Sequence, residues 1–224
     1  MVHFSKHLIC VFFIFALLTS ACHNNDNLPQ GNSSFNFSIG LDNKIKVAIL
    51  PFSGVDPTYS KLLKSEIEKF YSCEVTILKE HPLPSFAFYQ PRNRYKADSL
   101  LKYLKLSLPK DYNLIIGITG TDISTKDDIH EDWGVFGLGF MGGPSCIISD
   151  FRLKKSAIDK KHLQQRIIKV ALHELGHTLG LPHCTSSNKC LMKDANGTIK
   201  SVDEEEKQLC ESCKIKLASF RTIK

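Results

Sequence analysis

The stretch HELGHTLGLPH constrains the possible folds of this chain more than any other part of its sequence. Positions i and i+4 lie on the same face of a helix, so His173 and His177 can direct their imidazole nitrogens toward one metal ion. Gly180 can adopt the left-handed conformation that ends a helix, and Pro182 prevents its continuation. The chain can then reverse its direction, and we expect His183 to return as a third ligand.

Three protein ligands are typical of a catalytic zinc site, because they leave a fourth position for water. Zinc lowers the pKa of that water from about 15.7 toward about 7. Glu174 follows the first ligand, and we predict that it acts as general base and later passes the proton to the leaving amine. With 9 histidines and 10 glutamates in 224 residues, only about 0.016 chance occurrences of H-E-x-x-H are expected. This frequency disfavours the alternative of two histidines that simply pack in a buried helix.

Four of the eight cysteines lie close together on the C-terminal side of this motif. Cys210 and Cys213 have i, i+3 spacing on a predicted helix, whereas Cys184 and Cys190 lie on the preceding loop. Four thiolates complete a tetrahedral shell around zinc without room for water, so such a second site would be structural. Outside the cytosol the same cysteines could instead form two disulfides. The paired spacing favours zinc, and both possibilities stay open.

The position of Met192, two residues after Cys190, is compatible with an ordinary core methionine. Considered with the histidines, it resembles the Met-turn of metzincin proteases, in which a methionine supports the floor of the metal site. The whole run resembles the archaemetzincin family, whose pattern is H-E-x-x-H-x-x-G, three residues, then C-x4-C-x-M-x17-C-x-x-C. Seventeen residues separate Met192 from Cys210, as in the family, but five instead of four separate Cys184 from Cys190. The likeness extends upstream and covers roughly residues 45–220; it includes Arg94-Tyr95-Lys96-Ala97, Leu114 to Thr119, and Gly134 through Leu153.

The resemblance implies a compact metzincin-like zinc protease domain, with a zinc-binding helix and a cleft beneath the edge strand of its sheet. It also implies peptide or protein substrates. Residues 134–141 are our candidate for the edge strand, along which an extended peptide could pair. The sequence of this segment is equally compatible with an interior strand.

Upstream of the histidine motif, apolar segments alternate between strand and helix patterns. Strands are predicted at 45–51, 74–78, 113–118, 134–141 and 145–152. Helices are predicted at 57–71, 97–106 and 159–179, and a last one is predicted to begin near Ser201 and continue past Cys213. We expect loops at 81–94 and 119–132. This alternation predicts an α/β fold in one compact domain, with a mixed, mostly parallel sheet and helices packed on it.

The remaining charges and cysteines indicate no further site. The net charge of +6 comes from lysines scattered along the chain, so we predict no nucleic-acid binding. The acidic segment 119–132 lacks the spacing of an EF-hand and is predicted to be a solvated loop. Its titratable residues are Asp122, Asp127, Asp128, His130, Glu131 and Asp132. Cys73 and Cys146 lie outside both clusters and are either buried thiols or a disulfide.

The N-terminus carries the pattern of an export signal. Leu8 to Leu18 is an unbroken apolar run of 11 residues, whereas a helix needs about 20 to cross a bilayer. The following Leu18-Thr19-Ser20-Ala21-Cys22 resembles the lipobox of bacterial lipoproteins, with cleavage before Cys22 and lipid on its sulfur. Ordinary secretory cleavage near Ala21 is the alternative. We predict a lipoprotein-type signal peptide over 1–21, a flexible tether over 22–43 and an archaemetzincin-like domain over 44–224.

These features together predict a zinc metallopeptidase, held at the extracytoplasmic side of the cell envelope by its N-terminal lipid. Two other functions use the same residues. One is a zinc-dependent binding or scaffold lipoprotein without turnover, and the other is a small-molecule amidase. Neither the oligomeric state nor the cleavage specificity follows from the sequence.

Overall fold

The computed structural model describes residues 44–126 and 129–222. The predicted signal peptide, the proposed lipidation site Cys22 and the 22–43 tether lie outside the described residues, as do Asp127 and Asp128. Among the described helices, none has the length and apolar character needed to cross a membrane.

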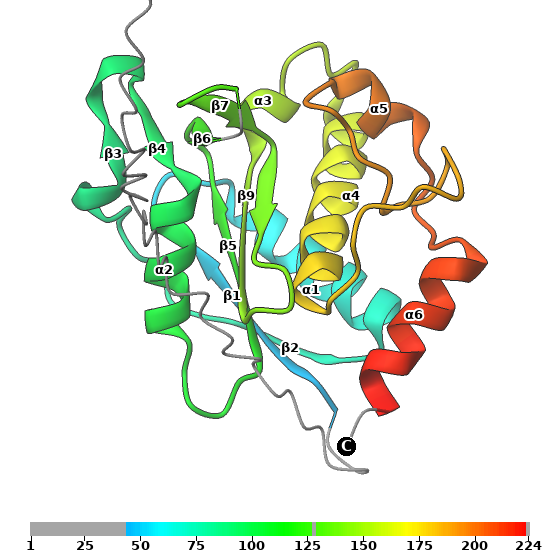
Figure 1. Ribbon diagram of the computed structural model, residues 1–224. Helices are drawn as coiled ribbons and strands as arrows, with labels where there is room; N and C mark the ends of the chain where they lie inside the picture. The colour runs from blue at the N-terminus through cyan, green and yellow to red at the C-terminus, as the bar shows by residue number, and fades with distance from the viewer. Residues whose placement is uncertain (1–43, 127–128, 223–224) are drawn as a thin grey trace, which may run out of the picture. The chain divides into compact units, whose positions relative to one another are not determined.

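A five-stranded sheet in the order β2-β1-β5-β9-β8 forms the centre of the fold (Figure 1). Four of its strands are parallel, and β8 at one edge is antiparallel to β9. The strands are β1 (Lys46–Pro51), β2 (Glu74–Ile77), β5 (Leu114–Thr119), β8 (Gly137–Gly139) and β9 (Ser145–Ser149). The predicted mixed, mostly parallel sheet is therefore confirmed.

Helices cover both faces of this sheet, which explains why β5 and β9 are buried along their whole length (Figure 1). Successive side chains of β1 point to opposite faces: Val47 packs with α1 and α4, and Ala48 packs with α2. The helices are α1 (Pro57–Tyr71), α2 (Ala97–Ser107), α3 (Asp150–Leu153), α4 (Lys160–Thr178), α5 (Ile199–Glu204) and α6 (Glu211–Thr222).

The long helices begin where their capping residues predict. The Asp56 carboxylate accepts a hydrogen bond from the Thr58 amide at the start of α1, and Pro57 occupies the first turn. The Asp159 carboxylate accepts one from the His162 amide at the start of α4. The predicted helices at 57–71, 97–106 and 159–179 are thus confirmed to within a residue at each end.

A second, four-stranded sheet was not predicted. Its order is β3-β4-β6-β7, and its strands are β3 (Phe88–Tyr89), β4 (Arg94–Lys96), β6 (Ile123–Thr125) and β7 (Trp133–Val135). Two short 3-10 turns, η1 (Ser85–Ala87) and η2 (Gln90–Arg92), flank β3. The predicted loops at 81–94 and 119–132 are therefore wrong in part, because strands of two or three residues are too short to show a periodic pattern.

The acidic segment was also expected to be solvated, but two of its carboxylates lie in ion pairs: that of Asp122, which is buried, and that of Asp132, which is partly buried. Arg152 Nε donates to Asp122 Oδ1 at 2.6 Å, and Lys96 Nζ donates to Asp132 Oδ1 at 2.6 Å. Arg94 lies between the two, 3.3 Å from Asp122 and 3.4 Å from Asp132. The cations come from β4 and α3, so the sequence around the acidic residues does not reveal their partners.

Three predicted elements end earlier than expected. The strand predicted at 134–141 is divided between β7 and β8, which belong to different sheets. The strand predicted at 145–152 stops at Ser149, whose hydroxyl accepts a hydrogen bond from the Phe151 amide and caps the start of α3.

The last predicted helix is two helices, because the segment between α5 and α6 pairs with the loop of Cys190. There the Leu191 amide donates to Gln208 O at 2.9 Å. Thr198, not Ser201, caps α5.

Candidate metal centres and active-site cleft

The end of α4 brings three histidines to one point. His173 and His177 lie on the same face of the helix, and Gly180, at φ +85°, ends it in the left-handed conformation that its sequence predicts. His183 then returns toward the helix. The nearest nitrogens of the three rings all lie within 4.8 Å of one another, so the structure places the predicted ligands together.

The orientation of these rings fits a metal ion. His173 Nδ1 lies 2.7 Å from Leu191 O, and His177 Nδ1 lies 2.8 Å from Leu181 O. A ring nitrogen beside a carbonyl oxygen carries the proton, which leaves both Nε2 atoms with exposed lone pairs. The two Nε2 atoms are only 3.0 Å apart, a distance at which lone pairs repel unless a cation lies beside them. The third ring, of His183, completes a donor set for zinc.

Burial keeps the rings of His173 and His177 neutral, as metal ligands must be. Burial, reinforced by the neighbouring His177, lowers the pKa of His173 to about 3. Burial also lowers the pKa of His177. Both imidazoles are therefore unprotonated at Nε2 in neutral solution and can donate an electron pair to a metal ion.

Glu174 is held between α4 and the edge strand β8. Its side chain is 8% exposed, and its carboxylate accepts a hydrogen bond from the Gly139 amide. Burial raises its pKa to about 8 although that hydrogen bond opposes the shift. Only glycines allow this approach: a Cβ at Gly137 would lie 2.6 Å from Glu174 Cγ, and one at Gly139 would lie 2.5 Å from the Glu174 carbonyl oxygen.

Met192 lies beneath the same helix, fully buried. A Cβ at Gly176 would lie 2.5 Å from Met192 Sδ, so the methionine packs against the turn that joins the first two histidines. The carbonyl oxygen of Met192 accepts a hydrogen bond of 2.6 Å from the Cys184 amide. These contacts place Met192 beneath the helix that carries His173 and His177.

A cleft of about 570 Å³ opens beside the histidines. Strands β7 and β8 form one side, and α4 with the segment 194–205 forms the other. Since β8 is the outer strand of its sheet, the edge position expected for residues 134–141 is confirmed for 137–139. The acidic residues among those that line the cleft are Glu174, Asp194 and Glu205.

Trp133, Asp194 and Glu205 are among the residues of this cleft that the sequence analysis missed. Asp194 Oδ2 lies 3.6 Å from His183 Nδ1, and no motif around it signals that contact. Glu205 falls within the last predicted helix, which was expected to continue from Ser201 past Cys213, but it is the C-terminal cap of α5 and is only 5% exposed.

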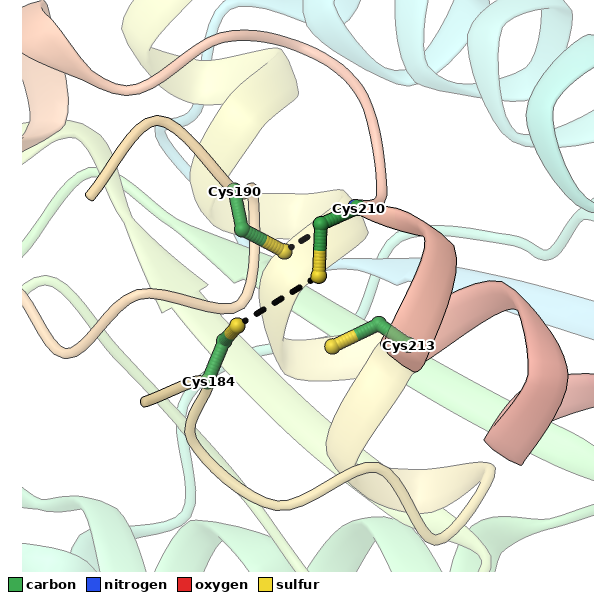
Figure 2. Close-up of side chains that lie close together, drawn as sticks. All are labelled: Cys184, Cys190, Cys210 and Cys213. Atoms are coloured by element: carbon green, nitrogen blue, oxygen red, sulfur yellow. Dashed lines mark hydrogen bonds between the residues drawn. The ribbon is translucent and has the colours of Figure 1, made fainter. Parts of the chain in front are cut away.

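The four clustered cysteines point toward one another (Figure 2). Their sulfur atoms all lie within 4.8 Å, and Cys184 Sγ and Cys210 Sγ are 3.5 Å apart. A tetrahedral zinc shell with Zn–S bonds of about 2.3 Å separates its sulfurs by about 3.8 Å. All four are thiols in the structure. Cys213 lies in the first turn of α6, and Cys190 lies on the loop that follows α4, so the cluster joins these two segments.

Backbone amides donate hydrogen bonds to two of these four sulfurs. The amides of Ser186 and Ser187 donate to Cys184, and the Cys210 amide donates to Cys190 Sγ at 3.3 Å. Burial raises the pKa of the Cys184 thiol, but the amides and the neighbouring Cys210 thiol outweigh it and lower that pKa to about 7. Such donors stabilise thiolates, the form in which cysteine binds zinc.

Two further cysteines of the described residues lie apart from this cluster. Cys73 is a buried thiol whose Sγ donates to Ile67 O at 3.6 Å. Cys146 is a fully buried thiol in β9, and burial raises its pKa well above the ordinary value. The structure therefore has the first of the two predicted alternatives, buried thiols.

An H-E-x-x-H helix beside the edge strand of a mixed sheet, with a third histidine after a glycine turn, defines the class of zinc metallopeptidases. The sequence model of Peptidase family M54 matches residues 74–219. The chain belongs to this family, the archaemetzincins.

Relatives of known sequence and structure agree with this assignment. The archaemetzincin of Halobacterium salinarum is 31% identical over 176 residues, which are 75% of this chain and 97% of the relative. The archaemetzincin of Archaeoglobus fulgidus, whose crystal structure is known, is 31% identical in sequence; its structure matches with a TM-score of 0.66 and covers 77% of this chain and 99% of the relative. The archaemetzincin of Methanopyrus kandleri is 26% identical in sequence; its crystal structure matches with a TM-score of 0.69 and covers 82% of this chain and 98% of the relative. The predicted family and fold class are confirmed.

Proposed function

We propose that this zinc metallopeptidase holds its catalytic zinc through His173, His177 and His183, and uses Glu174 as general base in peptide hydrolysis. The observation that supports this most directly is the convergence of the three imidazoles within 4.8 Å. The buried Glu174 carboxylate, which follows the first ligand, lines the same cleft.

Zinc at this site would polarise the scissile carbonyl and make a water molecule acidic enough to lose its proton near neutral pH. Glu174 would receive that proton at a carboxylate oxygen and later deliver it to the nitrogen of the leaving amine. The Gly139 amide holds the carboxylate in position. Leu191 O and Leu181 O hold the Nδ1 protons of His173 and His177, which fixes the orientation of both rings.

An extended substrate would lie along β8. In the described residues no strand pairs with the outer side of β8, so its backbone can add a peptide by strand pairing. The cleft runs between that strand and α4, next to Glu174. Strand pairing would therefore bring a peptide carbonyl over the histidines without any contact to a particular side chain.

We further propose that Cys184, Cys190, Cys210 and Cys213 hold a second, structural zinc ion. Four sulfur ligands leave no position for water or substrate. The site would join the loop that carries His183 to the first turn of α6. The amide donors to Cys184, which lower the pKa of its thiol, support a thiolate ligand, and the four free thiols support zinc in preference to two disulfides.

The proposed activity is tested with a mixed peptide library and mass-spectrometric detection of products. We expect hydrolysis by the zinc-loaded protein, loss of activity after chelation, and recovery when zinc is restored. Exclusive cleavage of short non-peptide amides would instead identify a small-molecule amidase. A protein that contains zinc at the histidines and hydrolyses neither class would be a binding or scaffold protein.

We also propose that residues 1–21 are removed on export and that Cys22 carries the lipid that anchors the enzyme at the extracytoplasmic side of the cell envelope. The short apolar run before Leu18-Thr19-Ser20-Ala21-Cys22 supports this processing. We expect mass spectrometry of the membrane fraction to find a lipidated N-terminal peptide that begins at Cys22, and Cys22→Ser to abolish it. An unmodified N-terminus near Ala21 would contradict the lipid anchor.

A further inference from the structure

Glu205 carries a buried carboxyl group that the proposed mechanism does not use. Its side chain is only 5% exposed and lines the cleft. Within the described residues, its carboxylate has no hydrogen-bond or ion-pair partner. Burial raises the pKa of Glu205 to about 8, and the more distant charge of Lys169 opposes that shift only in part. A buried acid without a partner is costly, which makes this position a candidate for binding a ligand of opposite charge.

The nearest cation does not neutralise Glu205 through a hydrogen bond. Lys169 on α4 is 9% exposed, and its ammonium donates to three carbonyl oxygens at the end of α5. These are Val202 O at 2.5 Å, Asp203 O at 3.1 Å and Glu205 O at 2.8 Å. All three protons of the Lys169 ammonium are thereby donated to backbone carbonyl groups, so none remains for the Glu205 carboxylate, which lines the cleft.

The charge of the cleft is opposite to that of the chain. The sequence has a net charge of +6, yet the cleft is lined by Glu174, Asp194 and Glu205 and by no described lysine or arginine. The residues that line the cleft together with Glu205 include the apolar Val170 and Val202. This part of the cleft, here called the channel, combines apolar side chains with a carboxylate, which matches a long aliphatic stem with a cationic end.

Trp133 and Phe136 extend the apolar lining on the opposite side of the cleft. Trp133 packs on Gly197, where a Cβ would lie 3.0 Å from the indole ring. Val170 lies four residues before Glu174 on α4, so the two share a helix face. The channel therefore lies beside the position where the proposed reaction takes place.

We propose that this channel is a subsite for a lysine or arginine side chain of the peptide substrate, next to the scissile bond, and that the Glu205 carboxylate binds its cationic group. This inference rests on the proposed peptidase function and specifies its substrate class. An ammonium or guanidinium in the channel would favour the ionised form of Glu205 and supply the partner that the carboxylate lacks.

The test measures peptide binding rather than turnover, so that it does not depend on activity. The protein is zinc-loaded Glu174→Gln, and the probes are fluorescently labelled hexapeptides of alanine with one residue replaced by lysine, arginine or norleucine. Norleucine has nearly the same aliphatic stem as lysine without its charge. We expect the basic peptides to bind about thirtyfold more tightly than the norleucine peptide in fluorescence anisotropy. In the Glu174→Gln/Glu205→Gln double variant we expect this ratio to fall below about threefold.

Glu204→Gln in the same background is the matched control. It removes the same charge from a neighbouring side chain that is 64% exposed, and we expect it to leave the preference for basic peptides unchanged. Equal binding of the lysine and norleucine peptides by Glu174→Gln would overturn the proposal, as would a preference that persists without Glu205. If the wild-type enzyme cleaves no peptide of any kind, the proposed function fails, whereas the binding ratio still decides on the subsite.

Discussion

Replacing Glu174 by glutamine is expected to lower kcat for peptide hydrolysis by at least about a hundredfold and to leave the zinc content unchanged. Glutamine has the same shape, and its amide oxygen can still accept the hydrogen bond from the Gly139 amide. It cannot accept the proton of the attacking water, so only the chemical step is removed. The measurement is kcat on a peptide that the wild-type enzyme cleaves, with zinc determined by elemental analysis.

Glu204→Gln is the control for this experiment, because Glu204 lies on the exposed face of α5 and outside the cleft. We expect that variant to retain wild-type kcat. Wild-type activity in Glu174→Gln would mean that another group takes the proton, and the proposed mechanism would then be wrong. Loss of zinc together with activity would mean that Glu174 is needed to hold the metal site rather than to move a proton.

The second large effect is expected for Cys213→Ser. Removal of one of four sulfur ligands should release one of two zinc ions per chain and detach the first turn of α6 from the loop of Cys190. We expect the thermal midpoint to fall by about 10 °C, which corresponds to about 3–5 kcal/mol for a domain of this size. Elemental analysis, thermal unfolding and limited proteolysis near α6 measure the three consequences.

Cys73→Ala is the matched control, since Cys73 is also buried but lies far from the four clustered cysteines in the sequence. This variant should retain both zinc ions, even if the cavity that the substitution leaves lowers its stability. A wild-type protein with one zinc ion and no thiol that becomes reactive after chelation would show that the four clustered cysteines form disulfides. That result would contradict the structural zinc site but leave the histidine site intact.

Features with a local cause could be predicted from the sequence. The beginning of α4 follows from Asp159, and its end follows from Gly180, which lies within the motif itself. The histidine and cysteine sites could be located for the same reason, because their spacing places the ligands of each site on adjacent turns or loops. The buried strands of the main sheet were recognisable as continuous apolar runs.

Features that depend on distant partners could not be predicted. Asp122 meets Arg152 across 30 positions of sequence, and only the folded chain shows that the aspartate is buried. Lys169 contacts the backbone at Glu205 across 36 positions. This contact lies at the C-terminal end of α5, within the segment that was predicted to form one longer helix. The burial of Glu205 in the cleft could therefore not be predicted, since its own neighbours in the sequence are charged.

His183 and Cys184 are consecutive residues, yet one side chain turns toward the histidine cluster and the other toward the cysteine cluster. A single peptide bond thus joins the two donor sets. Ordering either side chain restricts the backbone of the other, so part of the conformational entropy that one cluster must lose is already lost when the other is filled. If both clusters hold zinc as proposed, their metal binding is linked thermodynamically: an ion bound at one site would raise the affinity of the other, and the coupling free energy would be the same in both directions.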